Sequence, residues 1–210
     1  MSRTETMTLQ PSPPDSDGEP LTGAPDWVAA EMPPGYHNRL AEIQRLSQDL
    51  RAMDPFGRLL WASGPQLTEA VHDAFQALRF ETALLPGSDT DVVVTLDAGR
   101  LLCHVAQTAD IIKKKSPELT LAFQLLHESA EDHDRVVLIA NSDPSTPPAD
   151  RVDGIEPDAL TLLRRIGTNF LSSATVFRLW RLSLHDQERA RGYLTRLHAQ
   201  DGGIFLPTAI

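Results

Sequence analysis

Cysteine and lysine are among the scarcest residues of this 210-residue chain. The single cysteine, Cys103, excludes an intramolecular disulfide and a zinc site built from cysteines. The only three lysines are consecutive, Lys113 to Lys115. No apolar run reaches the length of about 18 residues that a membrane-spanning helix needs. Because Ser2 to Gly18 is polar, we expect no secretory signal and a cytoplasmic location.

Basic residues are also few relative to acidic ones, 19 against 29, so the formal net charge is -10. Residues 1–35 hold six acids and one arginine, so half of the net charge lies in this first sixth of the chain. A protein gains most of its non-specific DNA affinity by neutralising phosphates with lysine and arginine. The acidic balance therefore argues against strong general DNA binding, although a local basic patch stays possible.

The N-terminal part of the chain is expected to contain little structure. Residues 1–25 are rich in proline, serine, glycine and acids, a composition typical of a disordered tail. A short helical turn around Trp27 is expected next. Between residues 36 and 56 we predict an amphipathic helix with one apolar stripe, which ends at a break around Pro55, residues 54–57. That stripe comprises Leu40, Ile43, Leu46, Leu50 and Met53. The stripe packs either on the rest of the protein or, as the alternative, against a second copy of the chain.

The centre of the chain, residues 57–185, predicts an α/β domain. A helix over residues 66–78 is followed by three short apolar runs, and Asp97-Ala98-Gly99 is a typical hairpin turn between the last two. Another helix follows, with apolar residues at Leu119, Ala122, Phe123 and Leu126. A continuously apolar strand over residues 136–140 comes next, and then further helices and a strand. The uniformly apolar strand predicts helices on both faces of the sheet. Residues 186–210 are expected to form a final polar helix and an apolar tail.

Several strings in this region resemble the PD-(D/E)xK restriction-endonuclease-like superfamily, in its Mrr-like branch of prokaryotic domains. The string LLWASGPQLTEAVHDAFQALRFE resembles the family's entry helix, with Leu78-Arg79-Phe80 in place of its L-G-F ending. The strings VVLIANSDPSTPPADR and FLSSATVFRLWRL resemble its fourth strand, the proline-rich exit and the last strand and helix. The resemblance covers about 130 residues and implies a three-layer αβββαβ core, with added helices at both ends.

The same resemblance implies that the catalytic site is degenerate. The family places an aspartate at the second strand and an E-x-K tripeptide on the third, and these positions fall on Asp91 and on His104-Val105-Ala106. Two carboxylates hold Mg²⁺ against the scissile phosphate, and the lysine assists the attacking water. Because strand residues alternate in direction, Leu102, His104 and Ala106 share the catalytic face. Only Asp91 matches the triad.

A nuclease with exchanged ligands is the alternative. Its metal ligands would be Asp89, Asp91, His104 and, from the entry helix, Glu69. Imidazole is a poor ligand for Mg²⁺ and suits Mn²⁺ better, so His104 would change the metal preference. We expect no cofactor otherwise, and Mg²⁺ or Mn²⁺ only in this alternative.

Other polar groups are weaker candidates. The string HESAEDH, residues 127–133, has a histidine and Glu131 on one helix face but lacks the HExxH pattern of zinc proteases, so a polar helix end is the simpler interpretation. Cys103 alternates into an apolar face and is expected to be buried and unreactive. The lysine run is typical of a solvated loop, or of a contact with an acidic partner.

These observations favour a catalytically degenerate nuclease-fold domain that acts as a binding or regulatory module, with a DNA-linked process as one role for it. A protein partner or a homodimer is the expected partner, nucleic acid is a weaker expectation, and no membrane is expected. A third hypothesis, a sensor of a small ligand, requires a closed pocket with convergent polar groups over the strand ends.

Overall fold

The computed structural model describes residues 25–207. The chain divides into two compact units, residues 1–52 and 53–210, and each is described by itself. The expected disordered tail of residues 1–25 therefore lies almost wholly outside the described residues. In the first unit, α1 (Asp26–Ala30) forms the short helix expected around Trp27.

Helix α2 runs without interruption from Tyr36 to Trp61, although we expected a break at residues 54–57. Pro55 lies inside the helix and cannot donate a backbone hydrogen bond. The helix continues because its last turns are held in the second unit. Leu59 is fully buried there, and the Phe56 ring stacks on Trp180 with 4.3 Å between centroids. These packing contacts therefore outweigh the helix-breaking tendency of Pro55.

The second unit is built around a six-stranded mixed sheet, which confirms the expected α/β class. The strands are β1 (Glu81–Leu84), β2 (Asp91–Leu96), β3 (Gly99–Val105), β4 (Arg135–Ala140), β5 (Asn169–Ser172) and β6 (Gly203–Ile204). They lie in sequence order across the sheet. The first three form an antiparallel meander, and β3 to β6 are parallel to one another. The expected hairpin turn joins β2 to β3, where Gly99 has a φ of 141° that favours glycine.

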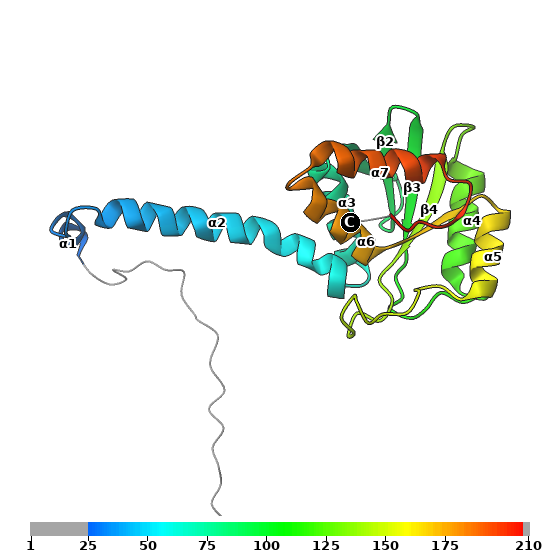
Figure 1. Cartoon of the computed structure of the whole chain (residues 1–210), viewed down its shortest axis with the longest axis horizontal. Helices are drawn as coiled ribbons and strands as arrows, with labels where there is room; N and C mark the ends of the chain where they lie inside the picture. The colour runs from blue at the N-terminus through cyan, green and yellow to red at the C-terminus, as the bar shows by residue number, and fades with distance from the viewer. Residues whose placement is uncertain (1–24, 208–210) are drawn as a thin grey trace, which may run out of the picture. The chain divides into compact units, whose positions relative to one another are not determined.

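Helices cover both faces of this sheet, as the uniformly apolar β4 predicted. These helices are α3 (Pro65–Ala77), α4 (Pro117–Ser129), α5 (Pro157–Arg165), α6 (Ser173–Ser183) and α7 (Gln187–Ala199). One face packs against α3, α6 and α7, and the other against α4 and α5. Figure 1 shows α4 and α5 side by side on their face of the sheet. Both faces of the central strands are consequently buried.

The C-terminal residues belong to this same core. Tyr193, Leu194 and Leu197 of α7 are buried in the cluster that also contains α3 and α6. The chain then turns at Gly202 and adds β6 to the sheet edge, parallel to β5. The sequence predicted the helix, but it did not predict the two-residue strand in the apolar tail, because so short a strand has no detectable alternation.

Candidate functional site

Asp91 and His104 are brought together by the register of the β2–β3 hairpin. The two residues are directly opposite each other, so their side chains lie on the same face of the sheet. The distance between Asp91 Oδ1 and His104 Nδ1 is 2.7 Å. The Ser88 hydroxyl donates to the other carboxylate oxygen of Asp91 at 2.6 Å. Both residues are candidate site residues from the sequence, and the structure brings them into contact.

Helix α4 packs on the face of β3 and β4 that carries the His104 side chain. The His104 side chain is only 2% exposed, and its Nε2 has no hydrogen-bond partner among the described residues. The other two positions of the expected catalytic face, Leu102 and Ala106, are buried as well. Leu102 packs with Ala122 of α4, and Ala106 packs with Leu119 of the same helix. The face that would hold the glutamate and the lysine is thus an apolar floor beneath a helix.

The covering face of α4 differs from the expected one. We predicted that Leu119, Ala122, Phe123 and Leu126 would face the sheet. The buried residues are instead Glu118, Leu119, Ala122 and Leu125, and Phe123 is 44% exposed. Leu119, Ala122 and the partly buried Leu126 thus pack as expected. Leu125 is buried in place of Phe123, because the apolar residues of α4 satisfy a 3.6-residue period in more than one way. Glu118 is a buried acid that sequence reasoning missed, and its Oε2 has no hydrogen-bond partner among the described residues.

The four candidate metal ligands are divided between two places. Glu69 is on α3, which packs against the face opposite Asp91 and His104, and its carboxylate lies 3.4 Å from Arg58. Asp89 is exposed in the β1–β2 connection and lines a surface hollow together with Glu69. Within residues 25–207, no three His, Cys, Asp or Glu side chains are grouped so that they could hold a metal ion. The rearranged nuclease site is therefore not assembled in this part of the chain.

Residues 127–133 form no metal site either. His127 makes an edge contact with the Phe123 ring, at 4.3 Å between centroids. Glu131 pairs with Arg100 at 3.2 Å, and the buried carboxylate of Asp134 accepts three hydrogen bonds from Arg100. These contacts anchor the α4–β4 loop to β3. The interpretation as a polar helix end agrees with them.

Cys103 lies in the core, as its position in the strand predicted. It is 1% exposed, and burial raises the pKa of its thiol. Because the thiolate is the nucleophilic form, Cys103 has no catalytic character in this setting.

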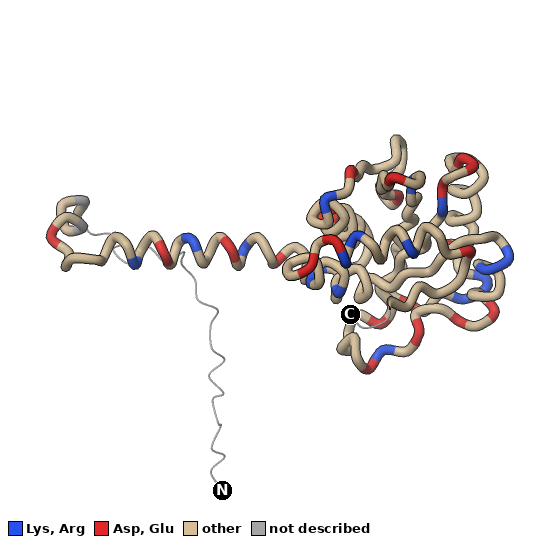
Figure 2. Tube along the Cα trace, turned by 45° about the horizontal axis from the view of Figure 1, so that its top comes forward, with Lys and Arg blue, Asp and Glu red and all other residues tan. Residues whose placement is uncertain are grey.

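Charge is mixed over the described surface. Figure 2 shows Lys and Arg interspersed with Asp and Glu along the chain, and the lysines at residues 113–115 are all exposed. No helix within residues 25–207 has both the length and the apolar character needed to cross a bilayer.

A second site lies where β4 and β5 end. From β4 the chain leads to α5 on one face of the sheet, whereas from β5 it enters α6 on the other face. When adjacent parallel strands send their following segments to opposite faces, a crevice opens outside their carboxyl ends, and ligands of α/β proteins bind in such crevices. Here a cavity of about 150 Å³ occupies that position.

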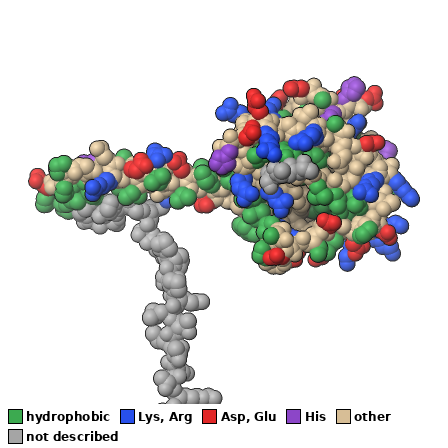
Figure 3. Space-filling view, viewed as in Figure 1, with side chains coloured by type: hydrophobic (Ala, Val, Ile, Leu, Met, Phe, Trp, Pro, Cys, Tyr) green, Lys and Arg blue, Asp and Glu red, His purple; other side chains and the backbone are tan. Residues whose placement is uncertain are grey.

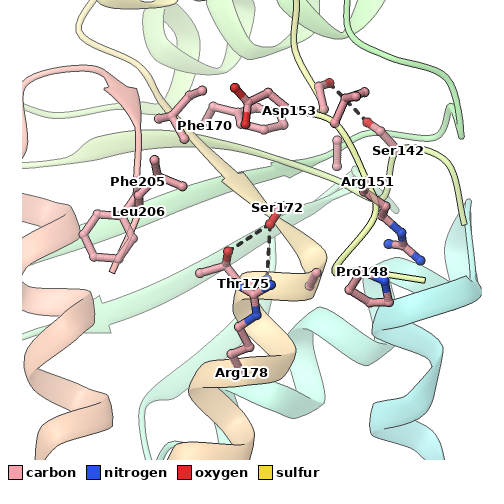
Figure 4. A pocket seen from close by; sticks show the side chains of 15 residues that line it. Ser142, Pro148, Arg151, Asp153, Phe170, Ser172, Thr175, Arg178, Phe205 and Leu206 are labelled. Carbon is pink, nitrogen blue, oxygen red and sulfur yellow. Dashed lines mark hydrogen bonds between the residues drawn. The ribbon is translucent and has the colours of Figure 1, made fainter. Parts of the chain in front are cut away.

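The cavity has an apolar floor and a partly basic rim (Figure 4). Its lining comprises Ala140, Ser142, Pro148, Arg151, Val152, Asp153, Gly154, Phe170, Ser172, Ala174, Thr175, Arg178, Ile204, Phe205 and Leu206. Figure 4 places Arg151 and Ser142 on the β4 side and Thr175 and Arg178 on α6. This site was not predicted from the sequence. The sequence feature that could have indicated the site is the pair Ser172 and Thr175, which forms a helix cap directly after a buried strand.

Comparisons of the chain with protein-family models, with curated proteins and with solved structures give no significant match. The mixed sheet with helices on both faces defines an α/β protein, and function has to be argued from the two sites.

The Asp91 carboxyl should make stability dependent on pH. Burial alone would raise its pKa, but hydrogen bonds from His104, Ser88 and Thr90 outweigh burial and hold the pKa below its ordinary value. A folded-state pKa below the unfolded one stabilises the protein above the unfolded pKa of about 3.9, and this stability is lost as the pH falls through the folded pKa. In the wild type we expect the urea midpoint to decrease between pH 5 and pH 3, limits that lie about one unit on either side of that value. The decrease should be smaller in Asp91→Asn, because this variant has no carboxyl group at position 91 to protonate.

The matched control is Asp89→Asn, two residues earlier and exposed. It should keep the wild-type pH dependence. An Asp91→Asn profile that parallels the wild-type profile would contradict the assigned hydrogen bonds.

Proposed function

We propose that this chain is a catalytically silent, restriction-endonuclease-like α/β module that acts by binding rather than by cutting DNA. The observation that carries the proposal is the burial of Leu102, His104 and Ala106 beneath α4. The element order α3, β1, β2, β3, α4, β4 supports the proposed fold, since it is the αβββαβ order of that core.

Phosphodiester cleavage by this fold needs two carboxylates, a lysine and a hydrated metal ion in reach of the scissile phosphate. The described site offers one carboxylate, Asp91, whose oxygens accept hydrogen bonds from neighbouring residues. The Lys113 to Lys115 run lies in the loop before α4 and supplies no lysine to β3. A metal-dependent nuclease with rearranged ligands is thus the weaker alternative, and the Asp91–His104 contact is the observation in its favour.

A second copy of the chain is the partner that we propose for α2. Four of its apolar side chains are 47–66% exposed, namely Ile43, Leu46, Leu50 and Met53. Their spacing of three, four and three residues is the alternation of a and d positions in a coiled coil. Glu42, Arg45 and Asp49 form ion pairs within the helix at 2.8 Å. Such a seam is self-complementary, which is why a homodimer is favoured over an unrelated partner.

DNA cleavage tests the catalytic part of the proposal. Supercoiled and linear DNA would be incubated with the full-length protein and Mg²⁺ or Mn²⁺, beside Asp91→Ala. We expect no metal-dependent cleavage by either protein, because the site has neither the second acid nor the lysine.

Cleavage by the wild type that disappears in Asp91→Ala and in His104→Gln would establish the rearranged nuclease and overturn the proposal. Cleavage that persists in both variants would point to a contaminant and would count for the silent module.

Self-association is tested by light scattering on the full-length chain. We expect the wild type to have the mass of two chains and Leu50→Glu that of one, because a charge at a central seam position would be buried without a partner. Gln48→Glu, an exposed position away from the seam, is the control and should remain dimeric. A monomeric wild type, or a dimer unaffected by Leu50→Glu, would contradict pairing through α2.

A further inference from the structure

The crevice at the ends of β4 and β5 has the shape and chemistry of a small-ligand site. A cavity of about 150 Å³ is comparable to engineered cavities that bind benzene. Its floor includes Phe170, which is 2% exposed, and Phe205, which is 7% exposed. At the rim, Val152 and Leu206 are 68% and 70% exposed. The crevice can therefore cover the apolar body of a small organic molecule.

The polar side of the crevice favours an anion. Arg151 and Arg178 line it together with one acid, Asp153, so its charged side chains sum to a single positive charge. Three of the five guanidinium N–H groups of Arg151 are used within the protein, by the carbonyls of Thr146 and Leu60 and by Asn141 Oδ1. These bonds fix the guanidinium in place and leave two donors.

Arg178 is the cation of the crevice that has no partner among the described residues. It is exposed, and its guanidinium makes no hydrogen bond or ion pair with any residue in the range 25–207. Thr175 lies three residues earlier on the same helix, at the end that Ser172 caps by accepting the Thr175 N–H at 3.2 Å. The positive end of the helix dipole adds to the attraction for an anion. Figure 3 shows basic side chains beside hydrophobic ones over α6.

We propose that this crevice binds a small organic monoanion, a carboxylate with a short apolar body. The apolar floor favours an organic molecule over an inorganic ion. The single net positive charge favours a monoanion over a phosphate dianion, because Asp153 would repel the second charge. The carboxylate would lie between Arg178 and the first turn of α6, and its body against Phe170 and Phe205.

This inference deepens the proposed function, because it gives the binding module its ligand class. The two claims can fail separately. The crevice is formed by β4, β5 and α6, whereas the silent catalytic face is on β2 and β3. DNA cleavage would overturn the silent module and leave anion binding untouched.

The experiment is a titration of the full-length ¹⁵N-labelled protein with benzoate, followed by amide chemical shifts. We expect saturable binding below roughly 20 mM, with shifts concentrated at residues 172–175 and 142. Benzamide, the neutral isostere, should bind at least about tenfold more weakly, because a charge-assisted hydrogen bond is worth about that factor. Inorganic phosphate should also bind at least about tenfold more weakly, because it has no apolar body to cover Phe170 and Phe205 and because Asp153 repels its second charge.

Two arginine variants locate the site. Arg178→Gln should weaken benzoate binding about tenfold. Arg181→Gln removes an exposed charge from the same helix outside the crevice and should leave affinity within about twofold. The proposal would be overturned if benzamide or phosphate bound as tightly as benzoate, or if the two variants weakened binding equally. Shifts at another place, or the absence of a saturable shift, would overturn it as well.

Discussion

The packing of α4 on the β3–β4 face is the constraint on which the other features of the second unit depend. Alternate residues of a strand point to opposite faces, and here both faces carry helices, so every side chain of central β3 must be compatible with a core. An ionised glutamate and lysine in this strand would need solvent, a metal or each other. His104 and Ala106 are compatible with burial, and His104 is tied to Asp91. The closure of this face by α4 and the absence of a glutamate and a lysine from it are therefore linked.

The alternation of the strands was predictable from the sequence, whereas the Asp91–His104 contact became clear only from the register of the hairpin. The Asp97-Ala98-Gly99 turn fixes the hairpin register, and the register places Asp91 opposite His104. The α/β class followed from the uniformly apolar β4. The alternation, the turn and the α/β class depend on patterns that are local in sequence, which is why single-sequence reasoning recovered them.

Features decided by long-range packing were not predictable in this way. Pro55 predicted a break that the contact of Phe56 with Trp180 overrides. The orientation of α4, which buries Glu118 and exposes Phe123, depends on the shape of the sheet below it. The crevice required knowing that α5 and α6 lie on opposite faces, since residues 140 and 172 are far apart in sequence. Glu69 was predicted near Asp91 because the face covered by α3 was unknown.

The two halves of the sheet thus have different roles. The β2–β3 half is closed and supplies stability, and the β4–β5 half is open at its carboxyl edge and offers a site. The proposed binding activity needs only the second half to be accessible, so it does not depend on the residues at positions 91, 104 and 106.

The stability of a chain with the family tripeptide restored tests the central claim most directly. His104→Glu combined with Ala106→Lys would be compared with Thr95→Glu combined with Ala98→Lys, which places the same charges at exposed positions of the hairpin. Because the first pair puts charges beneath α4, the account predicts a loss of about 4 kcal/mol or more in unfolding free energy, or failure to fold. The control pair should change stability by about 0.5 kcal/mol or less. A restored chain that keeps wild-type stability and gains Mg²⁺ binding would contradict the account.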